Sequence, residues 1–149
     1  MSYQSQTRNM KQLGKLLSQD LGHIYGEREN GPNGEKRQFL HTGRSFLSAL
    51  GRDLGFSQQR VYANSAGIAV SGEVYLRGIW HCSGIKLELT QDLKYNRCIN
   101  YRQIADMKDS AGGYPHFITL DEIIKADYVA LLERLFIDGK DGVYGRKAA

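Results

Sequence analysis

The spacing of apolar residues changes twice along this chain, and that change constrains the fold more than any motif does. In residues 9–25 apolar side chains recur every three or four positions, as on one face of an α-helix. In residues 68–80 they recur at every second position, as in a half-buried β-strand. From residue 120 the helical spacing returns. The chain is therefore predicted to be α+β, with helices before and after a small antiparallel sheet and packed on its apolar face.

The second predicted helix covers residues 43–54. Thr42 or Ser45 can cap its start, and Gly55 is placed to end it in a left-handed conformation. Four residues form its apolar face: Phe46, Leu47, Leu50 and Leu54. The charged, glycine-rich stretch 26–38 that precedes it is predicted to be a flexible loop.

The last helix has the clearest start. Thr119 and Glu122 form a T-x-x-E capping box, and apolar residues at helical spacing continue to residue 137. Residues 139–149 are predicted to be a loose tail. No internal repeat or change of composition indicates a domain boundary, so the 149 residues are predicted to form a single domain.

The sheet is predicted as a meander of segments 68–80, 85–91 and 97–104, with one dry face and one wet face. The loop that follows connects the sheet to the last helix. In the simpler interpretation this loop is a tight reversal, with Tyr114 and Phe117 closing the edge of the core.

The composition excludes several classes of protein. No apolar run approaches the roughly 20 residues of a membrane helix, and the N-terminal residues do not form a secretory signal, so a cytoplasmic protein without a membrane partner is predicted. Cys82 and Cys98 are predicted to be free thiols. The spacing of Cys and His matches no common zinc module, so neither a metal nor another cofactor is predicted.

The charge is +4 and unevenly distributed. Residues 1–60 carry nine Lys or Arg against five Asp or Glu, whereas residues 120–138 carry two against five. Such asymmetry points to an anionic partner, and an ordinary mixed surface is the alternative. Four of the nine tyrosines lie near the predicted sheet, where they could stack bases or cover its wet face: Tyr62, Tyr75, Tyr95 and Tyr101.

The stretch LGRDLGFSQQRV, residues 50–61, resembles the centre of a helix-turn-helix. Ser57 could cap a second helix that presents Gln58, Gln59 and Arg60 to base edges or phosphate. The competing interpretation makes Gly55 a plain helix stop and starts the first strand within residues 61–64, and the abundance of β-formers favours it.

A second candidate surface lies at the loop after the sheet. Arg102 and Lys108 flank a glycine-rich reversal whose amides could approach an anion. We expect these two cations to belong to a binding surface, which Arg44, Arg52 and Arg60 extend if the second helix lies nearby.

Catalysis has little support in the residues. No G-x-S-x-G, H-E-x-x-H or C-x-x-C occurs. Two acidic pairs, Asp106 with Asp109 and Glu73 with Glu88, leave a small metal-dependent nuclease as an alternative. A non-enzymatic protein is the favoured prediction.

Residues 46–117, including GFSQQRVYANSAGIAVSGEVYLRGIW and NYRQIADMKDSAGGYPHF, resemble small uncharacterised proteins and polyvalent-protein-associated domains of plasmids and phages. The resemblance implies an accessory role on a mobile element, such as DNA handling or inhibition of a host-defence complex, and supplies no active site. The predicted function is therefore non-enzymatic binding of nucleic acid or of a nucleoprotein complex. The alternatives are a helix-turn-helix regulator and a nuclease, and homo-oligomers are compatible with the sequence.

Overall fold

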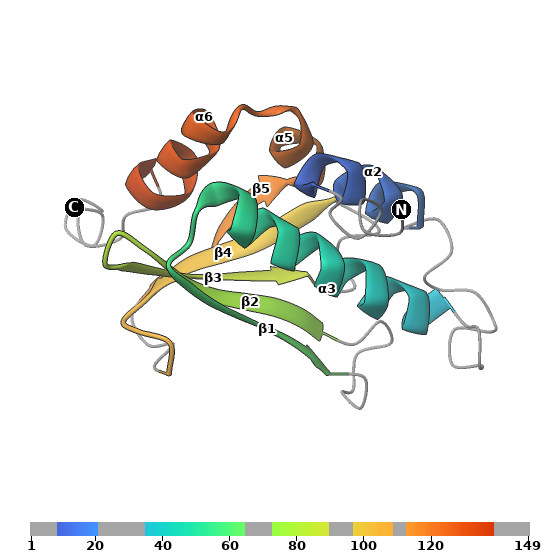
Figure 1. Cartoon of the computed structure of the whole chain (residues 1–149), viewed down its shortest axis with the longest axis horizontal. Helices are drawn as coiled ribbons and strands as arrows, with labels where there is room; N and C mark the ends of the chain where they lie inside the picture. Colours follow the sequence, from blue (N-terminus) through green and yellow to red (C-terminus); the bar gives the residue numbers. More distant parts are fainter. Residues whose placement is uncertain (1–8, 21–34, 65–72, 90–96, 109–112, 139–149) are drawn as a thin grey trace, which may run out of the picture.

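A computed structural model describes residues 9–20, 35–64, 73–89, 97–108 and 113–138. The elements in chain order are α2 (Met10–Asp20), α3 (Glu35–Leu54), β1 (Gln58–Asn64), β2 (Glu73–Trp80), β3 (Ser83–Leu89), β4 (Cys98–Ile104), β5 (His116–Thr119), α5 (Leu120–Lys125), α6 (Tyr128–Leu132) and the π-helical segment η2 (Glu133–Asp138). The strands form one antiparallel sheet in the order β1-β2-β3-β4-β5. The described helices lie together on one side of it (Figure 1), which confirms the α+β prediction.

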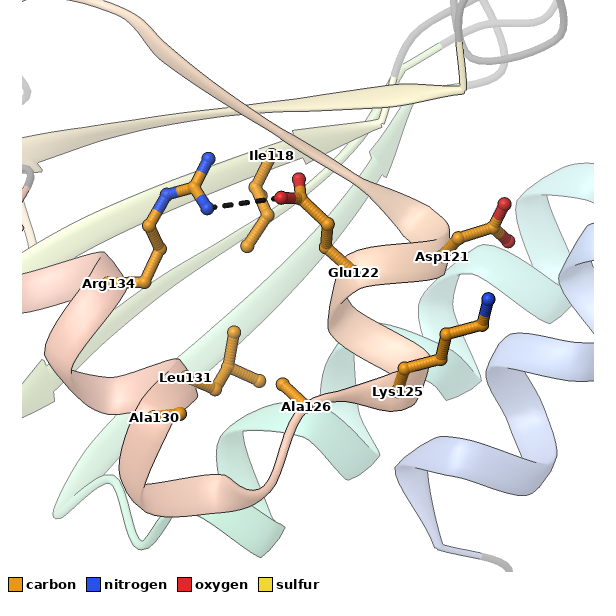
Figure 2. A pocket seen from close by; sticks show the side chains of 8 residues that line it. All are labelled: Ile118, Asp121, Glu122, Lys125, Ala126, Ala130, Leu131 and Arg134. Carbon is orange, nitrogen blue, oxygen red and sulfur yellow. Dashed lines mark hydrogen bonds and ion pairs between the residues drawn. The ribbon is translucent and has the colours of Figure 1, made fainter.

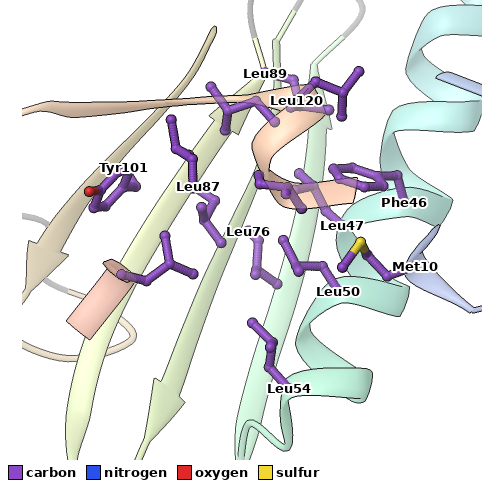
Figure 3. Close-up of a cluster of buried hydrophobic side chains, with 14 of the residues drawn as sticks. Met10, Phe46, Leu47, Leu50, Leu54, Leu76, Leu87, Leu89, Tyr101 and Leu120 are labelled. Atoms are coloured by element: carbon purple, nitrogen blue, oxygen red, sulfur yellow. The ribbon is translucent and has the colours of Figure 1, made fainter. Parts of the chain in front are cut away.

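The core lies between the sheet and these helices. Leu76 of β2 and Leu87 of β3 are fully buried, and so is Leu50 of α3, which lies opposite them (Figure 3). The dry face predicted for the sheet and the predicted apolar face of α3 are thus confirmed for the residues that the structure describes. The first helix, α5 and the C-terminal segment complete the core with Met10, Leu120 and Leu135, among others.

The helix α3 begins at Glu35, eight residues before the predicted start at 43. Thr42 and Ser45 therefore lie inside the helix and do not cap it, and residues 35–38 are not part of a loop. Two causes explain the difference. The run Glu-Lys-Arg-Gln consists of good helix formers, and Leu40 joins the core through the same helix face as Leu47.

The segment after α3 is a strand. Gly55 has a φ of +83° and ends the helix as predicted, and the chain then enters β1 at Gln58. The recognition helix of the helix-turn-helix prediction is therefore wrong. Every residue of β1 pairs with β2, from Gln58 with Ile79 to Asn64 with Glu73. Pairing with β2 along its whole length, together with β-formers such as Val61 and Tyr62, stabilises this segment as a strand.

A two-residue turn joins β2 to β3. His81 and Cys82 have φ values of +48° and +67°, the conformation that matches the twist of paired strands. The turn pairs Trp80 with Ser83 and so sets the register of the two strands, placing Arg77 opposite Lys86.

The loop predicted before the last helix contains a fifth strand, β5, which pairs Ile118 with Ile99 of β4. Phe117 and Tyr114 are exposed by 56% and 62% respectively, so the prediction that they close the core edge is wrong. The reason for Phe117 is alternation, because Ile118 takes the inward position of this strand.

The capping box of Thr119 and Glu122 is confirmed, but the predicted continuous helix is interrupted. Ala126 is extended, and the carboxylate of Asp127 caps α6 by accepting a hydrogen bond from the Ala130 amide (2.7 Å). Lys11 of α2 donates hydrogen bonds to the carbonyls of Ile124 and Ala126. This contact with another helix satisfies carbonyls that a continuing helix would otherwise bond.

Asp53 joins three helices. Its Oδ2 accepts hydrogen bonds from the Met10 amide (2.8 Å) and the Tyr128 hydroxyl (3.1 Å). Burial, together with the neighbouring Asp53 carboxylate, raises the pKa of Tyr128. Among the described helices, none has the length and apolar character needed to cross a membrane. The predicted segments 21–34, 68–72 and 139–149 lie outside the described residues.

Candidate functional site

The side of the sheet opposite the helices, called the outer face below, carries the clearest cluster of chemically related side chains. On β3, Lys86 and Glu88 alternate with fully buried leucine and isoleucine residues, so they lie on the outer face. The strand pairings then identify the residues of the other strands that share this face.

One row of the outer face consists of cations only. Arg60 pairs with Arg77, Arg77 with Lys86, and Lys86 with Arg102, one residue from each of four neighbouring strands. This cation row spans about 14 Å, because adjacent strands lie about 4.8 Å apart. Like charges directly opposite each other destabilise a sheet, so stability alone does not account for the row.

The two central cations are held in place by their surroundings. Arg77 donates a hydrogen bond from Nη1 to the Met107 carbonyl (3.0 Å), and Lys86 lies 3.8 Å from the Glu88 carboxylate. The buried Nε of Arg77 has no hydrogen-bond partner among the described residues. Leaving a buried donor without a partner costs free energy. The stability of the fold therefore does not explain why an arginine occupies position 77.

A second row, the aromatic row, runs beside the cation row, two residues further along each strand. Its members in strand order are Tyr62, Tyr75, Glu88, Asn100 and Phe117. The rings of Tyr62 and Tyr75 stack on each other, with centroids 4.6 Å apart and an interplanar angle of 15°. Lys86 lies 4.6 Å from the centroid of Tyr75, and the Arg77 guanidinium lies 5.7 Å from both tyrosine rings. The aromatic and cation rows therefore form one connected surface.

The structure brings together some of the residues that the sequence indicated. Arg60 and Arg102 lie in one row, Gln58 is exposed on the same face of β1, and Lys108 is exposed just beyond β4. The backbone amide of Lys108 donates to Asp106 Oδ1 (2.8 Å), which shapes this turn. The turn adjoins the row through Met107.

Three other predicted residues lie elsewhere. Arg44 and Arg52 are exposed on α3, on the opposite side of the sheet, so they do not extend the surface of Arg102 and Lys108 as expected. Arg52 also forms an ion pair with Asp53 (3.4 Å). Gln59 is on the inner side of β1, where its Nε2 donates to the Ser48 carbonyl of α3 (3.1 Å). It packs the helix against the strand and is not presented to a ligand.

Sequence reasoning missed Arg77 and Lys86 as site residues. The alternation of β2 and β3 does place both on the wet face, but alternation does not say which cations are neighbours. The informative feature is the turn at His81 and Cys82, because a two-residue hairpin connection determines the pairing of the residues before and after it.

A separate cavity of about 420 Å³ lies between α5 and α6 (Figure 2). Three of its four charged lining residues form contacts within the protein. Arg134 donates to Glu122 (3.3 Å) and to the Phe117 carbonyl (3.1 Å), and Asp121 pairs with Arg97 (3.1 Å). The Thr119 amide, which donates to Glu122, and Arg134 together lower the pKa of Glu122. Contact with Tyr101 raises the pKa of Arg134. These charges stabilise the C-terminal elements and are less suited to a ligand than the outer face.

The acidic pairs of the nuclease alternative are only partly described. Asp109 and the side chain of Glu73 lie outside the described residues, and Glu88 pairs with Lys86. Among the residues that the structure describes, no three His, Cys, Asp or Glu side chains come close enough to hold a metal ion.

Comparisons with protein-family models, with curated proteins and with solved structures find no match. The resemblance of residues 46–117 to plasmid and phage proteins stays a prediction.

Proposed function

We propose that the outer face binds nucleic acid and that the chain acts by binding, without catalysis. The observation that carries this proposal is the cation row, in which Arg60, Arg77, Lys86 and Arg102 lie side by side across four strands. A polyanion with regularly spaced charges neutralises such a row and relieves its internal repulsion. Arginine also matches the geometry of phosphate through paired N–H donors.

The surroundings of the row support the same ligand. On this face of the described strands, the four cations stand beside one acidic residue whose side chain the structure describes, Glu88. The chain as a whole is also basic, with a charge of +4. A nucleoprotein complex presents the same phosphates, so the proposal extends to such a complex as the partner. It also extends to an accessory role on a plasmid or phage.

The test is the salt dependence of binding to a fluorescent oligonucleotide, measured by anisotropy. If all four cations contact phosphate, log K should fall with log salt with a slope of about −3. The double variant Lys86→Gln with Arg102→Gln should bind more weakly and show about half that slope, because two phosphate contacts are lost. Its thermal midpoint should stay within a few degrees of wild type, since both residues lie on the outer face.

A matched control is available on α3. The double variant Arg44→Gln with Arg52→Gln has the same net charge as the first variant but changes the opposite side of the molecule. It should keep the wild-type slope. Equal losses in the two variants would mean that only total charge matters, and a wild-type slope in the first variant would remove the cation row from the interface. The oligonucleotide should also keep its length after incubation with divalent metals, whereas cleavage would favour the nuclease alternative.

A further inference from the structure

The outer face combines its cations with aromatic rings, and this combination discriminates between forms of nucleic acid. We infer that the ligand is a single-stranded nucleic acid that crosses the β-strands, an inference that rests on the function proposed above. Its phosphates lie along the cation row, and its bases stack on Tyr62 at one edge of the sheet and on Phe117 at the other.

The dimensions of the sheet argue against a duplex groove. Five strands at about 4.8 Å spacing are about 19 Å wide, whereas the major groove of B-DNA is about 12 Å wide and admits a helix or a two-stranded ribbon. The sheet could therefore touch a duplex only along its phosphates. In a duplex the faces of the bases are covered by neighbouring bases, so the aromatic row would have no partner. An unpaired strand exposes those faces.

The two rows are placed to contact the two parts of a nucleotide. They are separated by two residues along each strand, which is about 6.8 Å. A single strand that follows the cation row across the sheet therefore has its bases over the aromatic row. The cations alone would bind either form of nucleic acid, and the rings favour the unpaired one.

The Tyr62 ring is held by its stacked neighbour, and the backbone of Phe117 is fixed, before any ligand binds. Tyr75 lies between Tyr62 and Lys86, so Tyr62 is the ring of this pair that we assign to a base. At the other edge, Phe117 is 56% exposed, but its backbone is fixed by pairing with Asn100 and by the hydrogen bond from Arg134 to its carbonyl. An aromatic side chain on a fixed backbone has only two χ angles to order when it stacks on a base, so the entropy cost is small.

The experiment uses the whole chain and tests DNA and RNA separately. For each, one probe is a single strand (oligothymidine or oligouridine) and the other is a hairpin duplex. Tyr62→Leu and Phe117→Leu remove one ring each and leave every cation in place. Each should weaken single-strand binding by about fivefold to about a hundredfold, the effect of losing one stacked base. The salt slope and the weaker duplex binding should not change. Tyr62→Phe, which keeps the ring, should retain the affinity.

A control and a second readout complete the test. Tyr114→Leu removes an equally exposed aromatic that lies outside both rows, and it should leave binding unchanged. A 2-aminopurine base in the single strand should lose fluorescence on binding to wild type, and less so on binding to Tyr62→Leu or Phe117→Leu. Tighter binding to duplex than to single strand, or unchanged single-strand affinity in both ring variants, would overturn this inference while the cation row stands. Failure of every probe to bind would instead overturn the proposed function.

Discussion

Substitution of Gly78 by alanine is expected to destabilise the fold through a single side chain, Phe56. Gly78 lies on the inner face of β2, and a Cβ built there would overlap Cδ2 of Phe56 and lie 2.8 Å from its Cε2. Two carbon atoms without a bond prefer a separation of about 3.5–4.0 Å, so the ring would have to move. Phe136 packs edge-on against the ring at 5.8 Å between centroids. On another side, a Cβ at Gly51 would lie only 3.2 Å from it. The half-buried Phe56 ring would therefore have to shift and lose part of its packing against Phe136.

The size of the effect follows from two opposing terms. Overpacking of this kind costs about 1–3 kcal/mol. Replacement of glycine by alanine within a strand offsets about 0.5–1 kcal/mol of that cost by restricting the unfolded chain. Taking the middle of each range, we expect Gly78→Ala to lower the free energy of unfolding by about 1 kcal/mol.

Guanidinium denaturation followed by Trp80 fluorescence and by circular dichroism measures this change. Trp80 is the single tryptophan, and its ring lies 5.0 Å from that of Phe136, so it reports on the same region. In a Phe56→Leu background the penalty of Gly78→Ala should fall below about 0.5 kcal/mol, which a double-mutant cycle detects. An equal penalty in both backgrounds, or a Gly78→Ala variant as stable as wild type, would refute the reasoning. Oligonucleotide affinity should not change, because Gly78 faces the core.

Two further predictions concern stability. Leu87→Ala should lower the free energy of unfolding by about 2–5 kcal/mol, because Leu87 is fully buried in the core between the sheet and the helices. A loss below about 0.5 kcal/mol in the same denaturation assay would contradict that placement. Glu122→Gln keeps a capping side chain but loses the charge that Arg134 contacts. Because the pKa of Glu122 is lowered in the folded state, its carboxylate stabilises the protein above the ordinary glutamate pKa of 4.5, and that contribution disappears as the pH falls through the lowered pKa. The stability difference between wild type and Glu122→Gln should therefore be largest near neutral pH and shrink in acid, and a difference independent of pH would exclude this role.

Local patterns predicted the parts of the fold that depend on neighbouring residues. The spacing of Phe46, Leu47 and Leu50 identified the buried face of α3, and Thr119 with Glu122 identified the start of α5. In each case the interacting residues lie within one or two helical turns, so the necessary information is contained in a short window.

The predictions failed where contacts between residues far apart in the sequence determine the local structure. Residues 57–64 contain both a helix-capping serine and several β-formers, and pairing with β2 selects the strand. The apolar spacing continues through Ala126 without a break. The interruption there involves Asp127 as a new cap and Lys11, from the other end of the chain, as a donor to the last carbonyls of α5.

The same distinction applies to the candidate site, where some features follow from the sequence alone and others depend on the tertiary structure. The sequence alone determined that Arg77 and Lys86 each face outward, because alternation is a property of the extended backbone itself. It did not determine that Arg60 and Arg102 lie in line with them, or that Arg44 and Arg52 do not. Those relations depend on strand register, which the turn at His81 and Cys82 and the packing of the sheet against α3 establish between residues far apart in the chain. A slip of one residue would move each side chain to the other face, so only the tertiary structure could place four cations in one row.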